Sequence, residues 1–163
     1  MIPKNDAKSG SVGFRGWLQY IYRVLATKVE HYRPVNNSGP GVSLRIGEII
    51  YAIGDDEVSR AQSGATIAEA AWIGVVDNGG APGARVSVKT DGRTLVRFKN
   101  DEVLDSAAVG TPVYVSDAMG HASLTPGGIV SIIGVLEDGS EYVTVDNPVG
   151  YVYLKNTCVR GLP

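Results

Sequence analysis

Glycine interrupts this chain at short intervals, and this is the feature that most restricts its fold. The 163 residues include 21 glycines, and most stretches between them, apart from 17–38 and 93–109, are short. Many of these stretches are rich in Val, Ile and Thr and alternate apolar with polar residues. Such runs are typical of β-strands joined by tight turns. Long helices would instead repeat apolar residues about every 3.6 positions. The sequence therefore predicts an all-β fold, a small antiparallel β-barrel or sandwich.

Several strands and turns can be placed in the first part of this region. VSLRIGEIIYAIG is expected to form a strand with a turn at Gly47, and SRAQSGATIAEAA a loop with a short helical turn. WIGVVDNGG and ARVSVKTDGRTLVRF are expected to form two strands and a hairpin. The two-residue turn of that hairpin would be Asp91–Gly92, a pair that suits right-twisted strands.

The C-terminal part is also expected to consist of short strands, loops and turns. NDEVLDSAAVG is expected to be a loop, and PVYVS a strand that is followed by a turn and by another strand after Pro126. IVSIIGVLEDGSEYVTVDNP is expected to give two strands joined through Asp138–Gly139, and VGYVYLKNT a final strand. The predicted organisation is a basic N-terminal arm over residues 1–41, a β-rich domain over 42–157 and a short tail over 158–163.

The N-terminal arm is the one region where a helix is considered. Residues 1–16 are expected to be extended, and residues 17–32 combine a roughly helical apolar stripe with many β-forming residues. A short helix is slightly favoured there, and a strand remains open. Pro34 and the following NNSGPG are expected to end this element and form a linker.

Charge is distributed unevenly along the chain, although the net charge is only −2. Residues 1–45 contain seven Lys and Arg against two acidic residues, whereas the remainder contains eight against fifteen. This pattern favours an arm that docks on a negative surface. Aromatic and basic side chains alternate in it, and the candidate contact residues are Arg15, Trp17, Tyr20, Arg23, Lys28, Tyr32 and Arg33.

Two kinds of partner would suit such an arm. Aromatic residues between basic ones could stack on single-stranded nucleic acid. The acidic chain, with a pI near 5.6, argues against nucleic acid. Trp, Tyr and Arg are also the residue types that dominate protein interfaces. We therefore favour a protein partner.

Candidate catalytic residues are sparse. The two histidines, His31 and His121, lie in different segments. Asp117 or Ser116 could pair with His121, but no third group is placed to orient such a pair. Cys158 lies beside Arg160 near the C-terminus and is more typical of a packing residue than of a nucleophile. The sequence predicts that the chain is not an enzyme and that Asp117 and His121 are turn residues.

Cofactor and metal sites are also not expected. GGAPG at residues 79–83 lacks the Lys-Ser or Lys-Thr of a phosphate-binding loop, and Asp55–Glu57 is interpreted as a solvated acidic loop. One cysteine excludes an intrachain disulfide. Without a leader-like segment or an apolar run of about 20 residues, we expect a soluble protein made in the cytosol, with no membrane partner.

Four short segments in the second half carry a resemblance to a known family. In order, they are Gly110 with Val113–Val115, then Leu124–Pro126, then Ile133–Val135, then Val143–Val145. This order resembles the small head-decoration, or capsid cement, proteins of tailed bacteriophages, over about residues 42–146. The segment 1–41 departs from the shorter members, which begin close to the first strand.

The resemblance implies a structural role. It implies a β-barrel-like module on the outer surface of the capsid, often a trimer, that braces neighbouring capsomers after the shell has expanded. The partners would be the major capsid protein and further copies of the chain, and the location would be the virion after synthesis in the host cytoplasm.

Other functions remain open on the residues alone. A β-module associated with a tail, baseplate or fibre could bind a receptor or a glycan, and a row of exposed aromatic residues on one sheet face would favour it. A small hydrolase with an unrecognised site, and a binder of single-stranded nucleic acid, are weaker alternatives.

Overall fold

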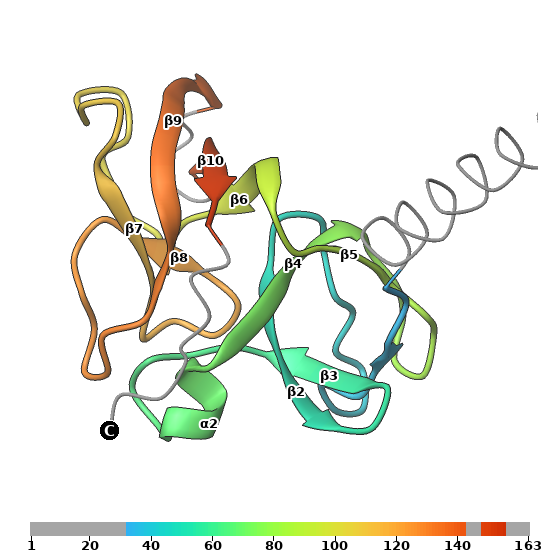
Figure 1. Ribbon diagram of the computed structural model, residues 1–163. Coiled ribbons are helices and arrows are strands. Elements are labelled where there is room, and N and C mark those ends of the chain that lie inside the picture. The colour runs from blue at the N-terminus through green and yellow to red at the C-terminus, as the bar shows by residue number, and fades with distance from the viewer. Residues whose placement is uncertain (1–31, 143–147, 156–163) are drawn as a thin grey trace, which may run out of the picture. The chain divides into compact units, whose positions relative to one another are not determined.

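The computed structural model describes residues 32–142 and 148–155, and nearly all of the regular secondary structure in this part is β (Figure 1). It contains two curled, mostly antiparallel sheets that form half-barrels, and one short helix, which confirms the predicted all-β class. The compact unit extends from Arg33, so the β-structure starts before the expected boundary at Val42. The arm element expected over 17–32 lies, apart from Tyr32, outside the described residues, as does the tail over 158–163.

The first sheet has the strand order β1-β3-β2-β4-β5. Its strands are β1 (Val35–Asn36), β2 (Ile49–Gly54), β3 (Glu57–Arg60), β4 (Trp72–Asn78) and β5 (Ser87–Lys89). All its pairs are antiparallel except that of β1 with β3. The two ends of the sheet meet, because Val35 forms a β-bridge with Arg85 just before β5, and backbone hydrogen bonds from Asn36 and Val86 support the contact.

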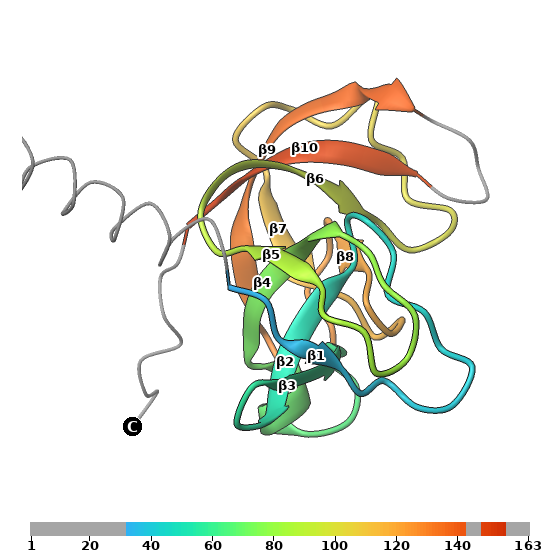
Figure 2. The same cartoon turned by 90° about the vertical axis from the view of Figure 1, so that its right-hand side faces the viewer.

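The second sheet has the order β6-β10-β9-β7-β8, and all pairs of its named strands are antiparallel (Figure 2). Its strands are β6 (Gly92–Arg97), β7 (Pro112–Val115), β8 (Ala122–Ser123), β9 (Ile132–Tyr142) and β10 (Val149–Leu154). Its two ends also meet, through a parallel bridge between Phe98, which follows β6, and Ala122 of β8. Each sheet therefore curls until its first and last strands lie next to each other.

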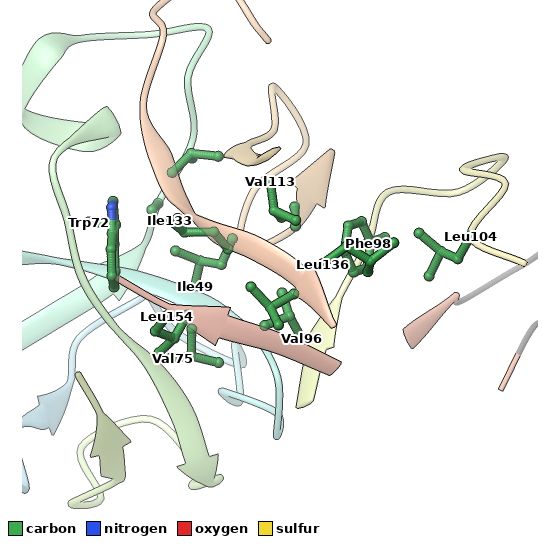
Figure 3. Close-up of a cluster of buried hydrophobic side chains, with 14 residues drawn as sticks. Ile49, Trp72, Val75, Val96, Phe98, Leu104, Val113, Ile133, Leu136 and Leu154 are labelled. Atoms are coloured by element: carbon green, nitrogen blue, oxygen red, sulfur yellow. The ribbon is translucent and has the colours of Figure 1, made fainter. Parts of the chain in front are cut away.

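A common hydrophobic core joins the two sheets (Figure 3). Ile49, Trp72 and Val75 enter it from the first sheet, and strands of the second sheet supply most of the rest. Those further members include Val96, Phe98, Leu104, Val113, Ile133, Leu136, Val152 and Leu154. Burying an aliphatic side chain of this size contributes about 1.5–3 kcal/mol relative to leaving it exposed. The alternation that predicted the strands is thus the alternation of core-facing and outward residues.

The helix α2 (Ile67–Ala70) forms the short helical turn expected in SRAQSGATIAEAA. Thr66 is its N-cap, and the Thr66 side chain accepts a hydrogen bond from the backbone N–H of Glu69 at 3.2 Å. The Glu69 carboxylate in turn accepts from the Thr66 hydroxyl at 3.3 Å. This local Thr-x-x-Glu pairing explains why a helical turn forms in an otherwise β-rich chain.

The hairpin predicted at Asp91–Gly92 is wrong. β5 pairs with β4 and β6 pairs with β10, so the runs on either side of this dipeptide belong to different sheets. Gly92 has a φ of +76°, which supplies a sharp bend where the chain crosses from one sheet to the other. The dipeptide forms a bend between two strands. Burial determines which sheet each strand joins: Val88 is buried in the first sheet and Val96 in the second.

The turn predicted at Asp138–Gly139 is also wrong, because β9 runs without interruption through both residues. A Cβ on Gly139 would lie 2.3 Å from the carbonyl oxygen of Leu104. The glycine therefore allows the loop between β6 and β7 to lie directly against the strand. The register between β9 and β10 shifts near Asp138, as is usual where a strand contains an irregularity.

Candidate functional site

Only two of the residues expected to contact a partner fall in the described part of the chain. Tyr32 is half-buried, and Arg33 is exposed, with its carbonyl oxygen accepting a hydrogen bond from Arg85 Nη1 at 2.6 Å. Arg15, Trp17, Tyr20, Arg23 and Lys28 lie outside the described residues. Their proposed contact role therefore stays a prediction.

The stretch around Asp117 and His121 forms a hairpin, but its second strand lies before Pro126 and not after it, where the sequence predicts it. β7 pairs with β8 through Tyr114 opposite Ser123 and Val115 opposite Ala122, and both candidate residues lie in the loop between them. The strand expected after Pro126 starts later, at Ile132, and pairs with the other side of β7. Asp117 and His121 are thus loop residues, as expected.

Asp117 does more than occupy a turn. Its Oδ1 accepts hydrogen bonds from Ser63 Oγ at 2.5 Å and from the Gly128 backbone N–H at 3.2 Å. The Ser63 hydrogen bond is the largest cause that holds the pKa of Asp117 below its usual value, and the Gly128 hydrogen bond comes next. The positive charge of Lys99 acts in the same direction. The carboxylate therefore connects three loops of the fold.

Gly127 explains the Pro-Gly-Gly sequence that follows. A Cβ at this position would lie 1.9 Å from Ser63 Oγ and 2.5 Å from Asp117 Oδ1, closer than any side chain can approach. The absence of a side chain at Gly127 is therefore what lets the Ser63–Asp117 hydrogen bond form. We call Ser63, Asp117, Gly127 and Gly128 the Asp117 clamp.

The geometry of the clamp does not match that of a Ser-His-Asp triad. A triad needs an imidazole that takes the serine proton and a carboxylate that orients the imidazole. Here Ser63 is fully buried and donates directly to Asp117, whereas His121 Nδ1 lies 2.7 Å from the Met119 carbonyl oxygen. Because a carbonyl only accepts, Nδ1 is the protonated ring nitrogen in this contact. The clamp is a structural connection.

A hollow of about 300 Å³ lies beside the hairpin and is lined by Lys99, Asn100, Ala118 and His121. Lys99 Nζ is 3.6 Å from the carboxylate of Glu102, which also accepts hydrogen bonds from the Ser123 hydroxyl and the Leu124 N–H. Within the described residues, no group of three or more His, Cys, Asp or Glu side chains is arranged to hold a metal ion.

Two further carboxylates have structural partners. Glu48 is buried and accepts from Arg60, with a closest contact of 2.9 Å, and from the Arg45 backbone N–H at 2.8 Å. In the acidic triplet at the β2–β3 turn, Asp56 pairs with Arg85 at 2.6 Å. Part of that triplet is therefore bound within the fold rather than simply solvated.

The outward face of the second sheet is the other surface with functional residue types. Tyr153 on β10 is 49% exposed, and Tyr151 on the same face is half-buried. The guanidinium of Arg93 stacks 3.8 Å from the Tyr151 ring centroid and pairs with Glu137 of β9 at 3.1 Å. These residues were not among the sequence-based candidates, although the alternation in VGYVYL places both tyrosines on one face.

No protein-family model matches the sequence, and no curated protein matches it either. Among the described residues, none of the helices has the length and apolar character needed to cross a bilayer.

Proposed function

We propose that the chain is a structural virion protein that binds the outer surface of a bacteriophage capsid and stabilises it by bridging capsomers. Support comes from the segments that carry the family resemblance. Val113–Val115 lies in β7 and Ile133–Val135 lies in the neighbouring β9, so two of these segments form adjacent strands of one sheet. Val143–Val145 lies outside the described residues.

The proposed partners are the major capsid protein and further copies of the chain, with a homotrimer as the expected assembly and the capsid exterior as the location. No catalytic step, cofactor or nucleic acid is part of this proposal. The contacts need not be strong individually, because many copies on one shell combine modest affinities into a large total.

Heat disruption of shells tests this proposal. Expanded shells of the phage that encodes the chain would be heated with and without saturating protein, and release of capsid protein would be followed by light scattering. We expect disruption at a higher temperature when the protein is present. An unchanged disruption temperature at saturating concentration would contradict the proposal.

The basic arm has its own test within this proposal. Removing residues 1–31 keeps Arg33, whose carbonyl is bonded to Arg85, and leaves the β-unit intact. If the arm reaches the capsid protein or a neighbouring subunit, the shortened chain occupies fewer sites on the shell. Equal occupancy of the full and shortened chains would remove the arm from the proposal.

A second candidate function is favoured by one observation. Tyr151 and Tyr153 lie on one outward sheet face, beside the hydrogen-bonding groups of Arg93 and Glu137. A tail, baseplate or fibre module that binds a receptor or glycan would use such a face, since sugar rings stack on aromatic side chains. A glycan array separates the two candidates: specific binding that disappears in Tyr153→Ala supports the second, and absence of binding supports the first.

A further inference from the structure

Two surfaces of the β-unit have complementary chemistry. The first, the tyrosine face, lies on strands β6, β10 and β9 and consists of Tyr151, Tyr153, Leu95 and Val135, the ion pair of Arg93 with Glu137 across Tyr151, and Arg97 at the border. The second, the acidic loop, spans residues 100–111 between β6 and β7 and presents Asp101, Val103, Asp105 and Val109.

Strand register makes the tyrosine face continuous. Tyr153 lies opposite Val135 on one side and Arg93 on the other, and Tyr151 lies opposite Leu95. Neighbouring residues in a sheet have Cβ atoms about 5 Å apart, so these side chains form one surface across three strands. Tyr153, Leu95 and Val135 give it an apolar and aromatic part, as in the core of a protein interface, and the Arg93–Glu137 ion pair crosses the face over the Tyr151 ring.

The border of this face has positive charge that is not neutralised within the fold. Arg97 donates from Nε to the Ile46 carbonyl at 2.7 Å and forms no ion pair with any described residue. Arg60, Arg85 and Lys99, by contrast, all pair with carboxylates elsewhere in the β-unit. The Arg97 guanidinium can therefore form an ion pair with a carboxylate of another molecule.

The acidic loop has the opposite properties. Val103 is 61% exposed and Val109 is 78% exposed, and the carboxylates of Asp101 and Asp105 are exposed and form no ion pair with any described residue. The loop is held in place from beneath, because Leu104 is fully buried and its backbone lies against Gly139. Such a preformed loop loses little conformational entropy on binding.

We propose that the tyrosine face of one copy binds the acidic loop of a second copy. Val103 and Val109 would cover the apolar part of the face formed by Tyr153, Leu95 and Val135. Asp101 or Asp105 would pair with Arg97. Tyrosine and arginine are also the residues that most often dominate binding energy at interfaces. The contact joins two different surfaces, so it can close a ring of subunits or extend a chain.

This inference deepens the proposed function, because it names the surfaces through which copies would associate on a shell. Its test uses the free protein without shells, so either idea can fail alone. Sedimentation equilibrium of the full chain over a range of concentrations should give a mass that rises above the 17.2 kDa of one copy.

Charge reversal on each surface provides the decisive test. Arg97→Glu places a carboxylate opposite the aspartates of the second copy's acidic loop, and Asp105→Arg places a cation opposite Arg97. Each variant alone should therefore weaken association about tenfold or more. In an equal mixture, each contact between unlike variants has an opposite-charge pair, whereas a ring of three keeps one contact between like variants, so association should recover in part toward that of the wild type.

Matched variants control this experiment. Asp55→Arg makes the same change in charge as Asp105→Arg, but at an exposed carboxylate of the β2–β3 turn, and should leave association unchanged. Tyr153→Ala should weaken association, and Tyr153→Phe should retain it because the ring remains. Circular dichroism establishes that each variant is folded.

Three results would overturn the inference: a wild-type chain that stays monomeric at high concentration, a mixture no better than its components, or an equal effect of Asp55→Arg. Glycan binding that requires Tyr153 in a chain that remains monomeric would assign the face to a saccharide instead. Association that disappears when residues 1–31 are removed, but is insensitive to both charge reversals, would place the contact on the N-terminal segment.

Discussion

The Asp117 clamp and the tyrosine face contain residues that catalysis and binding commonly use, but their surroundings differ. In the clamp, the Ser63 hydroxyl and the Asp117 carboxylate bind each other, and Gly127 and Gly128 pack against them. On the tyrosine face, an aromatic ring at Tyr153 is half exposed and Arg97 has no carboxylate partner among the described residues.

This difference separates residues that hold the fold from residues that can serve a partner. A polar group that is satisfied inside the protein has little left to offer a ligand, and removing it costs stability. An exposed ring contributes little to stability, and removing it costs binding. Substitutions in the clamp are therefore expected to change stability, and substitutions on the tyrosine face are expected to change binding.

The largest effect is expected from Gly127→Ala. The added methyl group overlaps Ser63 Oγ and Asp117 Oδ1, so the clamp has to open or the loop has to move. We expect a loss of roughly 2–3 kcal/mol in the free energy of unfolding, as for overpacked sites, measured by urea denaturation. Gly128→Ala is the matched control, because its Cβ would meet no atom closer than 3.5 Å. Equal losses in both variants would show that the clamp is not the cause.

A smaller loss of stability is expected from Ser63→Ala. The substitution removes the buried hydroxyl that donates to Asp117, at a cost of about 1–2 kcal/mol in the free energy of unfolding. Ser106→Ala, at an exposed position in the loop between β6 and β7, serves as the control. If the two variants were equally stable, the hydrogen bond would contribute nothing measurable.

Acid should weaken the clamp in a defined direction. Because folding lowers the pKa of Asp117 from its ordinary value of 3.8, the contribution of the carboxylate is complete above that value and is lost as the pH falls through the lower pKa of the folded state. Urea denaturation between pH 7 and about pH 3 measures this. Relative to Asp117→Asn, the wild-type advantage should be constant near neutrality and shrink in acid. An advantage that grows in acid would contradict the assignment.

The smallest effect on stability is expected from Tyr153→Ala. With 49% of the residue exposed, the free energy of unfolding should change by about 0.5 kcal/mol or less, while self-association weakens. Thermal unfolding and sedimentation of the same sample measure both properties. A large loss of stability with unchanged association would place Tyr153 with the clamp residues and remove the contrast between the two regions.

Much of the fold could be predicted because the alternation of apolar and polar residues, and the glycines at turns, are signals that come from neighbouring residues. The strand at PVYVS, the final strand at VGYVYL, the helical turn at Ile67–Ala70 and the turn at Gly47 were all expected from residues within a few positions of each other. The sheet to which each strand belongs was harder to predict. Asp91–Gly92 and Asp138–Gly139 look alike locally, yet one is a bend between sheets and the other lies within a strand.

The candidate sites, too, were predicted where the signal is local and missed where it depends on distant residues. Asp117 and His121 were expected in a loop, but the role of Asp117 depends on Ser63, which is distant in sequence and gave no local signal. The tyrosine face required knowing that β6, β10 and β9 are neighbours. Pairing over long sequence separations determines both, and a single sequence does not reveal it.

Co-sedimentation with shells tests most directly whether the chain is a capsid-binding structural protein. Purified protein of residues 1–163 would be mixed at increasing concentration with expanded and with unexpanded shells of the proposed phage, and the bound copies per shell would be counted from the pellet. Binding to expanded shells that saturates at a fixed number of copies, with little binding to unexpanded shells, is the predicted result. A protein that stays in the supernatant with both kinds of shell would contradict it.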